Sequence, residues 1–159
     1  MSNLENKQDV KVYNIKDKIE YLKEVITLEY NEWAKDKETD YEKRIEEKIN
    51  KVKNMLNEND FCKLILLKGN TLVGFISIFS KDLEEFSNLT PWYATMYVKK
   101  EFRGNGYSRI LDKAIKEEAK KRGFKELYLK TDIKDYYEKF GAKYITNINE
   151  TEKLYKMEL

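Results

Sequence analysis

Residues 90–111, TPWYATMYVKKEFRGNGYSRIL, decide the fold. The stretch reads as an apolar and aromatic β-strand over 92–98, a turn with two glycines over 103–106, and an amphipathic helix that enters at Tyr107. A strand that feeds a helix through such a turn directs several backbone N–H groups, and the positive end of the helix dipole, at one point. Arg103 adds a fixed positive charge at the same place. The stretch therefore predicts a site for a phosphate or a pyrophosphate.

Two glycines alone do not distinguish a phosphate loop from a tight turn. The Walker pattern G-x-x-x-x-G-K-[ST] is absent, and the dinucleotide pattern G-x-G-x-x-G would need a glycine where Arg109 stands. What remains is Arg103-x-x-Gly106-x-Ser108, placed between a strand and a helix. These exclusions leave a phosphate-binding turn of another kind.

The rest of the chain supplies the elements around this stretch. The strand–helix–strand unit of residues 91–130 predicts a right-handed parallel crossover, and the two strands before it extend an antiparallel meander. We expect an α/β (α+β) fold, with a mixed, mostly antiparallel, twisted sheet of about seven strands flanked by about four helices. No linker or internal repeat interrupts the chain, so residues 1–159 are expected to form a single domain. The helices are expected near 18–34, 41–56, 104–122 and 135–141, and the other strands near 10–15, 61–67, 71–79, 125–130, 142–148 and 153–159.

Composition argues against several classes of function. The 31 basic and 29 acidic residues give a net charge of only +2, so no nucleic-acid partner is expected. The absence of histidine removes histidine triads and the commonest zinc sites, and no metal is expected. No apolar run is long enough to cross a bilayer, and the N-terminus lacks the apolar core of a signal peptide. We therefore expect a cytoplasmic protein with no membrane partner.

Two segments carry a resemblance to a known family. Residues 98–108, VKKEFRGNGYS, resemble the acetyl-CoA signature of the GNAT superfamily of N-acetyltransferases, [RQ]-x-x-G-x-[GA], which follows a strand ending in valine. Ser108 stands where the family usually has glycine or alanine. Downstream, residues 136–142, YYEKFGA, resemble the family's F-Y-x-x-x-G-F segment, with Ala142 where an aromatic residue is common. The two matches have the order and spacing of the family, so the resemblance implies the GNAT fold.

The resemblance implies acetyl-CoA as co-substrate. In the family, the amides of the turn hold the coenzyme A pyrophosphate, and the fourth and fifth strands splay apart to admit the pantetheine arm. The backbone of Met96 and Val98 would pair with that arm as another strand would. The residues expected to contact coenzyme A are Met96, Tyr97, Val98, Arg103, Gly104, Asn105, Gly106, Tyr107, Ser108, Thr131 and Tyr137.

Tyr137 stands where the family often places a general acid, whose hydroxyl protonates the departing coenzyme A thiolate. A phenol with a pKa near ~10 is protonated at neutral pH and suits a thiol leaving group with a pKa of about 8.5. The general base stays open, because strand 92–98 contains neither a carboxylate nor a histidine. Glu29 and Glu32 on the first helix are candidates, and so are Asp132 and the loop carboxylates Asp82, Glu84 and Glu85, directly or through water.

The acceptor side, by the same resemblance, is formed by the first helix and the acidic loop 82–86. Carboxylates there favour a cationic amine, such as an aminoglycoside, a polyamine or an amino compound. We therefore expect an N-acetyltransferase that moves acetyl to the primary amine of a small, cationic molecule by direct transfer, in a protein that can form a homodimer. A protein or peptide amine as acceptor, and a non-catalytic coenzyme A-binding sensor, stay open as alternatives. The residues expected to contact the acceptor are Trp33, Glu84, Trp92 and Tyr93.

Overall fold

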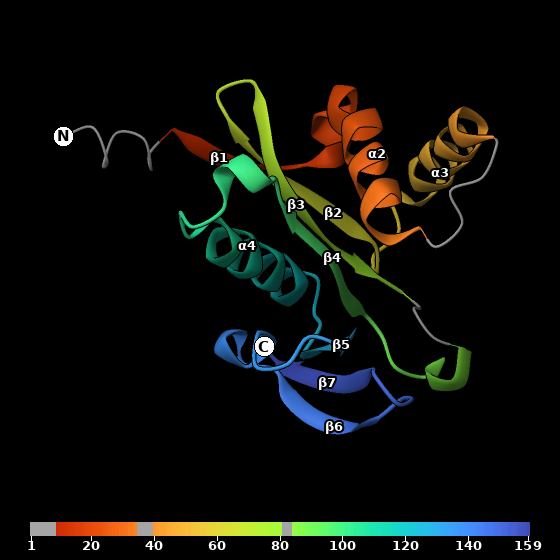
Figure 1. The fold of residues 1–159 in the computed structure, drawn as a ribbon, viewed down its shortest axis with the longest axis vertical. Helices are drawn as coiled ribbons and strands as arrows, with labels where there is room; N and C mark the ends of the chain where they lie inside the picture. Colours follow the sequence, from red (N-terminus) through yellow and green to blue (C-terminus); the bar gives the residue numbers. More distant parts are fainter. Residues whose placement is uncertain (1–8, 35–39, 81–83) are drawn as a thin grey trace.

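The computed structural model describes residues 9–34, 40–80 and 84–159, which contain one mixed sheet of seven strands (Figure 1). The strand order is β1-β2-β3-β4-β5-β7-β6, and every neighbouring pair is antiparallel except β4 and β5, which are parallel. The expected class and the parallel crossover are thereby confirmed. The strands are β1 (Val10–Asn14), β2 (Cys62–Lys68), β3 (Thr71–Phe79), β4 (Trp92–Val98), β5 (Glu126–Thr131), β6 (Lys143–Asn147) and β7 (Lys153–Glu158).

The described residues contain three α-helices where about four helices were expected. The fourth expected helix, near 135–141, is a 3-10 turn, Tyr137–Phe140. It is confined between Asp135 at φ 57° and Gly141 at φ 90°, two left-handed residues that leave too few positions for α-helical hydrogen bonds. The helices are α2 (Leu22–Trp33), α3 (Tyr41–Met55) and α4 (Tyr107–Lys121), and the other 3-10 turns are Ile15–Asp17, Ile19–Tyr21, Glu84–Phe86 and Lys100–Phe102.

The helices cover both faces of the sheet, with α2 and α3 on one side and α4 on the other (Figure 1). The alternation of side chains along β2 shows why. Ile65 and Leu67 join the apolar core under α2 and α3, whereas Leu64 and Leu66 join the core under α4. A strand that is apolar on both faces needs a helix layer on each, and this chain supplies them.

Strand β4 has two halves with different neighbours. Near its start it pairs with both β3 and β5, but Trp92↔Tyr128 is its single register pair with β5. Further on, a β-bulge places two β4 residues, Thr95 and Met96, opposite one residue of β3. Thr95 adopts φ 51°, in the left-handed region. The bulge bends the strand, so β4 diverges from β5 over its second half.

Candidate active site

A cleft of about 1090 Å³ opens where β4 and β5 diverge. Its walls come from the second half of β4, the end of β5, the first turn of α4 and the segment around the 3-10 turn Tyr137–Phe140. The volume lies just above the range of about 300–1,000 Å³ that is typical of small-molecule sites. Every residue expected to contact coenzyme A lines this cleft except Asn105. The side chain of Asn105 instead donates to the carbonyl of Phe102 at 3.0 Å and braces the turn.

The first turn of α4 presents uncapped backbone donors to the cleft. Gly106 is the N-cap residue, at φ 77°, and no side chain caps the helix start. The first N–H groups of a helix have no partner within the helix, so here they remain available to an anion. Gly106, Tyr107 and Ser108 all line the cleft. The local geometry therefore suits a phosphate group.

Two arginines flank this helix start. The Nε of Arg103 donates to the carbonyl of Val98 at 2.8 Å, and its guanidinium lies 5.6 Å from the centre of the Tyr97 ring. Arg109, on the first turns of α4, lies 5.7 Å from the centre of the Phe140 ring and also lines the cleft. Sequence reasoning missed Arg109, although its helical position next to the turn is a usable signal. Both cations strengthen the attraction for a polyanionic ligand.

Tyr137 lines the same cleft with its ring edge-on to two other tyrosines. The ring centres lie 6.1 Å from Tyr93 and 4.8 Å from Tyr136. Burial, with a smaller contribution from Tyr136, raises the pKa of Tyr137 to about 12. No side-chain hydrogen bond to the described residues contributes to this raised pKa. Tyr137 thus offers a protonated donor at neutral pH.

The segment that carries Tyr137 is fastened to α4 through buried polar groups. The Tyr93 hydroxyl donates to Oδ1 of Asp112 at 2.8 Å, and burial together with the Asp112 charge raises the pKa of Tyr93. Lys116 lies 3.1 Å from the same Asp112 oxygen and also donates to the carbonyl of Phe140. Tyr93 was expected to contact the acceptor; it does line the cleft, but its hydroxyl is committed to Asp112.

The structure separates the two carboxylates proposed as bases on the first helix. Glu29 is paired with the buried Lys63 and does not line the cleft, whereas Glu32 does. Asp132 and Glu152 also line it, and nothing in the local sequence around Glu152 indicated this position. Asp82 and the side chain of Glu84 lie outside what the structure describes, so their predicted roles stay predictions.

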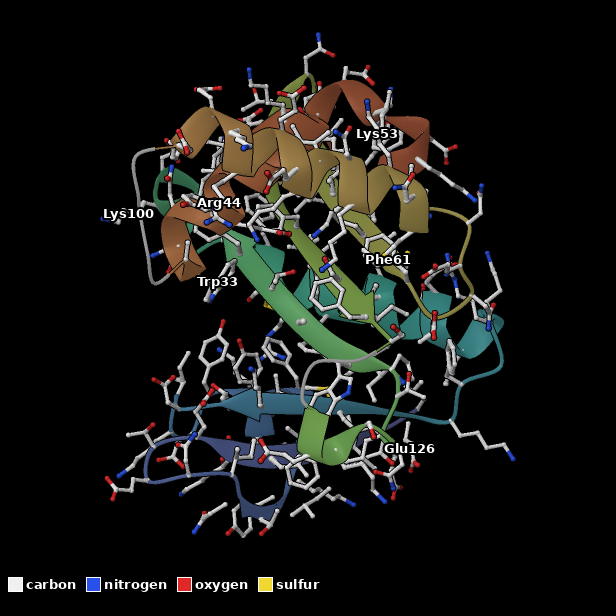
Figure 2. The ribbon with its side chains drawn as sticks, turned by 90° about the vertical axis from the view of Figure 1, so that its right-hand side faces the viewer. Trp33, Arg44, Lys53, Phe61, Lys100 and Glu126 are labelled. Atoms are coloured by element: carbon white, nitrogen blue, oxygen red, sulfur yellow. The ribbon has the colours of Figure 1, made fainter. Side chains whose placement is uncertain are left out.

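The two tryptophans expected on the acceptor side have different environments. Trp33 lies at the end of α2 (Figure 2). It lines the cleft with 46% of its surface exposed, and its ring is edge-on to Tyr97. Trp92 does not line the cleft. It is fully buried in a small core with Tyr128 and Leu154, where its indole N–H donates to the carbonyl of Leu89 at 2.9 Å. The structure therefore places Trp92 in the core instead of the acceptor side.

The described residues contain neither a candidate metal centre nor a helix that could span a membrane. No group of three or more cysteine or acidic side chains there is arranged to hold a metal ion. The helices of that same part are all too short or too polar to span a bilayer.

The chain belongs to the GNAT acetyltransferase family, whose model matches residues 20–142. No curated protein matches it. Among solved structures it is similar to an acetyltransferase from Streptococcus agalactiae, with a TM-score of 0.68 and 18% identity over 96% of this chain and 99% of that one.

Two further structures extend the comparison. The PaiA N-acetyltransferase from Thermoplasma acidophilum, solved in complex with coenzyme A, has a TM-score of 0.65 and 21% identity, covering 94% of this chain and 99% of that one. A mutant of the spermidine N-acetyltransferase SpeG from Vibrio cholerae has a TM-score of 0.68 and 10% identity, covering 95% of this chain and 94% of that one. At such identities the likeness shows a shared fold.

Proposed function

We propose that this protein is an acetyl-CoA-dependent N-acetyltransferase that moves an acetyl group to the primary amine of a small, cationic molecule by direct transfer. The observation that supports it most is the composition of one cleft. The uncapped start of α4, the half of β4 that does not pair with β5, and the hydroxyl of Tyr137 all line it. The start of α4 suits a polyanion, the unpaired half of β4 suits an extended chain, and the Tyr137 hydroxyl is a proton donor.

We assign the donor side of the cleft to acetyl-CoA. The amides at the start of α4, with Arg103 and Arg109, suit its pyrophosphate. Along β4, Met96 lies in the bulge and Tyr97 and Val98 pair with β3 on one side only, which leaves backbone groups for the amide-bearing pantetheine arm. When bound, acetyl-CoA supplies the activated acetyl group.

Tyr137 is proposed as the general acid. Its raised pKa keeps the phenol protonated across the physiological range, so that it can donate to the sulfur that leaves as thiolate. No side-chain hydrogen bond contributes to that raised pKa among the described residues, which supports this assignment.

The acceptor and its base are assigned from the carboxylates that line the cleft. Glu32, Asp132 and Glu152 favour a positively charged molecule. Glu32 is proposed as the base, directly or through water, because Glu29 is already the counter-ion of Lys63. SpeG, whose fold this chain shares, acts on spermidine, and a polyamine is the acceptor class we place first.

The test is release of free thiol from acetyl-CoA across a panel of polyamines, aminoglycosides and short peptides. We expect turnover with at least one small cationic amine, and acetylation of peptides alone would favour the alternative of a protein or peptide acceptor. Binding of coenzyme A in a thermal-shift assay without thiol release on any amine would favour the non-catalytic sensor. Failure of both acetyl-CoA and coenzyme A to bind would overturn the proposal.

Residues 1–159 are proposed to form one domain, since all seven strands belong to a single sheet. A cytoplasmic location and a homodimer are proposed with it, and size-exclusion chromatography with light scattering measures the latter.

A further inference from the structure

A lysine lies buried beneath α2, outside the cleft. Lys63 on β2 is 1% exposed, and its ammonium forms an ion pair with Glu29 of α2. The same ammonium donates to the hydroxyl of Ser77, the residue directly opposite on β3, at 2.7 Å. Burial of an ammonium is costly unless the charge is paired and hydrogen-bonded, and here both conditions are met. The proposed reaction does not use this charge.

The hydrogen bonds continue from Lys63 toward the cleft. The Thr95 hydroxyl donates to Oγ of Ser77 at 3.0 Å, and Thr95 lines the cleft. Thr95 is also the bulge residue at φ 51°. A β-branched residue in the left-handed region is an outlier that persists only when its surroundings hold it. Ser77 and Lys63 are the groups that hold its side chain.

The chain of groups is not a path for a proton from the cleft to Glu29. An ammonium has three N–H donors and no lone pair, so Lys63 cannot accept a proton from Ser77. The order Thr95, Ser77, Lys63, Glu29 therefore ends in a fixed charge. These hydrogen bonds hold the four side chains in place and do not transfer a proton.

We propose that Lys63 is a positioning residue that maintains the β4 bulge. Through Ser77 it holds Thr95 in the conformation that turns β4 away from β5 and opens the cleft. Through Glu29 it also fixes α2 about one turn before Glu32 and Trp33, which line the cleft. The buried ammonium of Lys63 thus positions two walls of the cleft, the second half of β4 and the end of α2. Its consequence for coenzyme A binding rests on the proposed function; its effect on Thr95 does not.

The first experiment measures the backbone of Thr95 directly. Ser77→Ala removes the link between Lys63 and Thr95 but leaves the ion pair intact. We expect the Cα and Cβ chemical shifts of Thr95 to move from left-handed toward extended values in this variant. Lys63→Met combined with Glu29→Gln removes both charges at once and is expected to produce the same change. Left-handed shifts at Thr95 in both variants would overturn the proposal.

The control is Val73→Ala, a cavity-forming change on β3, the strand that also carries Ser77. Val73 is fully buried in the core on the α4 side of the sheet, away from the Lys63 chain. We expect this variant to lower the melting temperature at least as much as Ser77→Ala while leaving the Thr95 shifts unchanged. A shift change of equal size in Val73→Ala would mean that general loosening of the sheet, and not Lys63, controls the bulge.

The second experiment measures coenzyme A affinity in a double-mutant cycle. Ser77→Ala should weaken binding about tenfold, the usual size of one lost hydrogen bond in a charged network. Thr95→Gly accepts φ 51° without support, so adding Ser77→Ala to it should change affinity less than twofold. Equal losses in both backgrounds would overturn the positioning role. Absence of coenzyme A binding by the unmodified protein would overturn the proposed function. The chemical shifts of Thr95 would still decide whether Lys63 maintains the β4 bulge.

Discussion

Strand β4 begins as an ordinary interior strand and ends as one wall of a cleft. Its paired half starts at Trp92, next to β3 on one side and β5 on the other, and is buried. Its open half, from Thr95 to Val98, lines the cleft and pairs only with β3, through Tyr97 and Val98 beyond the bulge. The two halves are separated by one bulge.

The difference shows how a continuous sheet can leave strand backbone unpaired without a free edge. The paired half joins β5 to the rest of the sheet, through Trp92↔Tyr128 and the bond from the Tyr128 N–H to the carbonyl of Pro91 at 3.0 Å. The open half keeps backbone groups that a partner strand would otherwise occupy. Stability should therefore depend on the first half, and binding and catalysis on the second.

The largest effect is expected from Trp92→Ala in the paired half. Removing a fully buried indole should lower the free energy of unfolding by about 3–5 kcal/mol, because it leaves a cavity between Tyr128 and Leu154. Urea denaturation followed by circular dichroism measures it. Affinity for coenzyme A, measured where the variant is fully folded, should be unchanged.

The matched control is Trp33→Ala at the cleft. This tryptophan is 46% exposed, so its loss should cost less than about 1 kcal/mol of stability and appear instead as a higher KM for the acceptor. If the two substitutions had equal effects on stability, the distinction between the buried core around Trp92 and the wall of the cleft would not hold.

Tyr137→Phe should have the next largest effect, on rate and not on stability. Loss of a general acid typically lowers kcat by about 100-fold or more, equivalent to roughly 2.7 kcal/mol. The ring remains to pack against Tyr93 and Tyr136, so the fold should be unaffected. Steady-state thiol release at saturating acetyl-CoA measures the change.

Tyr144→Phe is the control for that substitution. Tyr144 lies on β6, the strand at the far edge of the sheet, and its hydroxyl donates to Asn147. It should retain full turnover. Unchanged kcat in Tyr137→Phe would remove Tyr137 from the proposed mechanism.

The local features of this site were predictable and the long-range ones were not. Residues 98–108 specify a strand, a turn and a helix start within one short window, and the structure has them there. Trp92 and Tyr93 are adjacent aromatic residues whose surroundings depend on β5 and β7, so no local pattern separates the core residue from the cleft residue. Lys63 within the run 61–67 is similar, because the carboxylate that makes its burial tolerable is 34 residues away in the sequence. The hydrogen bonds that reach Thr95 through Ser77 start from this same lysine.

Gly106→Ala should have a smaller effect on stability. It distinguishes the contribution of the open half of β4 to binding from that of the start of α4. Gly106 has φ 77° and a Cβ there would meet no atom, so the cost is conformational, about 1–2 kcal/mol of stability. We expect weaker coenzyme A binding as well, since relief of the strain would re-orient the amides at the start of α4. Isothermal titration calorimetry measures the affinity.

Gly123→Ala is the matched change just beyond the other end of α4. Gly123 has φ 95° and equally open surroundings, so its stability cost should be similar. Its affinity for coenzyme A should stay at the level of the unmodified protein. Equal weakening in both variants would show that helix stability, and not the geometry of the turn, controls binding.

The smallest expected effect is on the pH dependence of the unfolding free energy, which reports how far water is excluded from Tyr137 beside the open half of β4. Burial raises the pKa of Tyr137 from 10.0 to about 12, so the folded protein holds this proton more tightly than the unfolded chain. That contribution to stability is fully present below pH 10 and is lost as the pH rises toward 12. Between pH 8 and pH 10.5 the unmodified protein should therefore lose roughly 1 kcal/mol of unfolding free energy relative to Tyr137→Phe. Urea titrations at the two pH values measure it. Parallel curves would mean that water reaches the phenol freely, in which case the open half of β4 would face solvent and not an enclosed cleft.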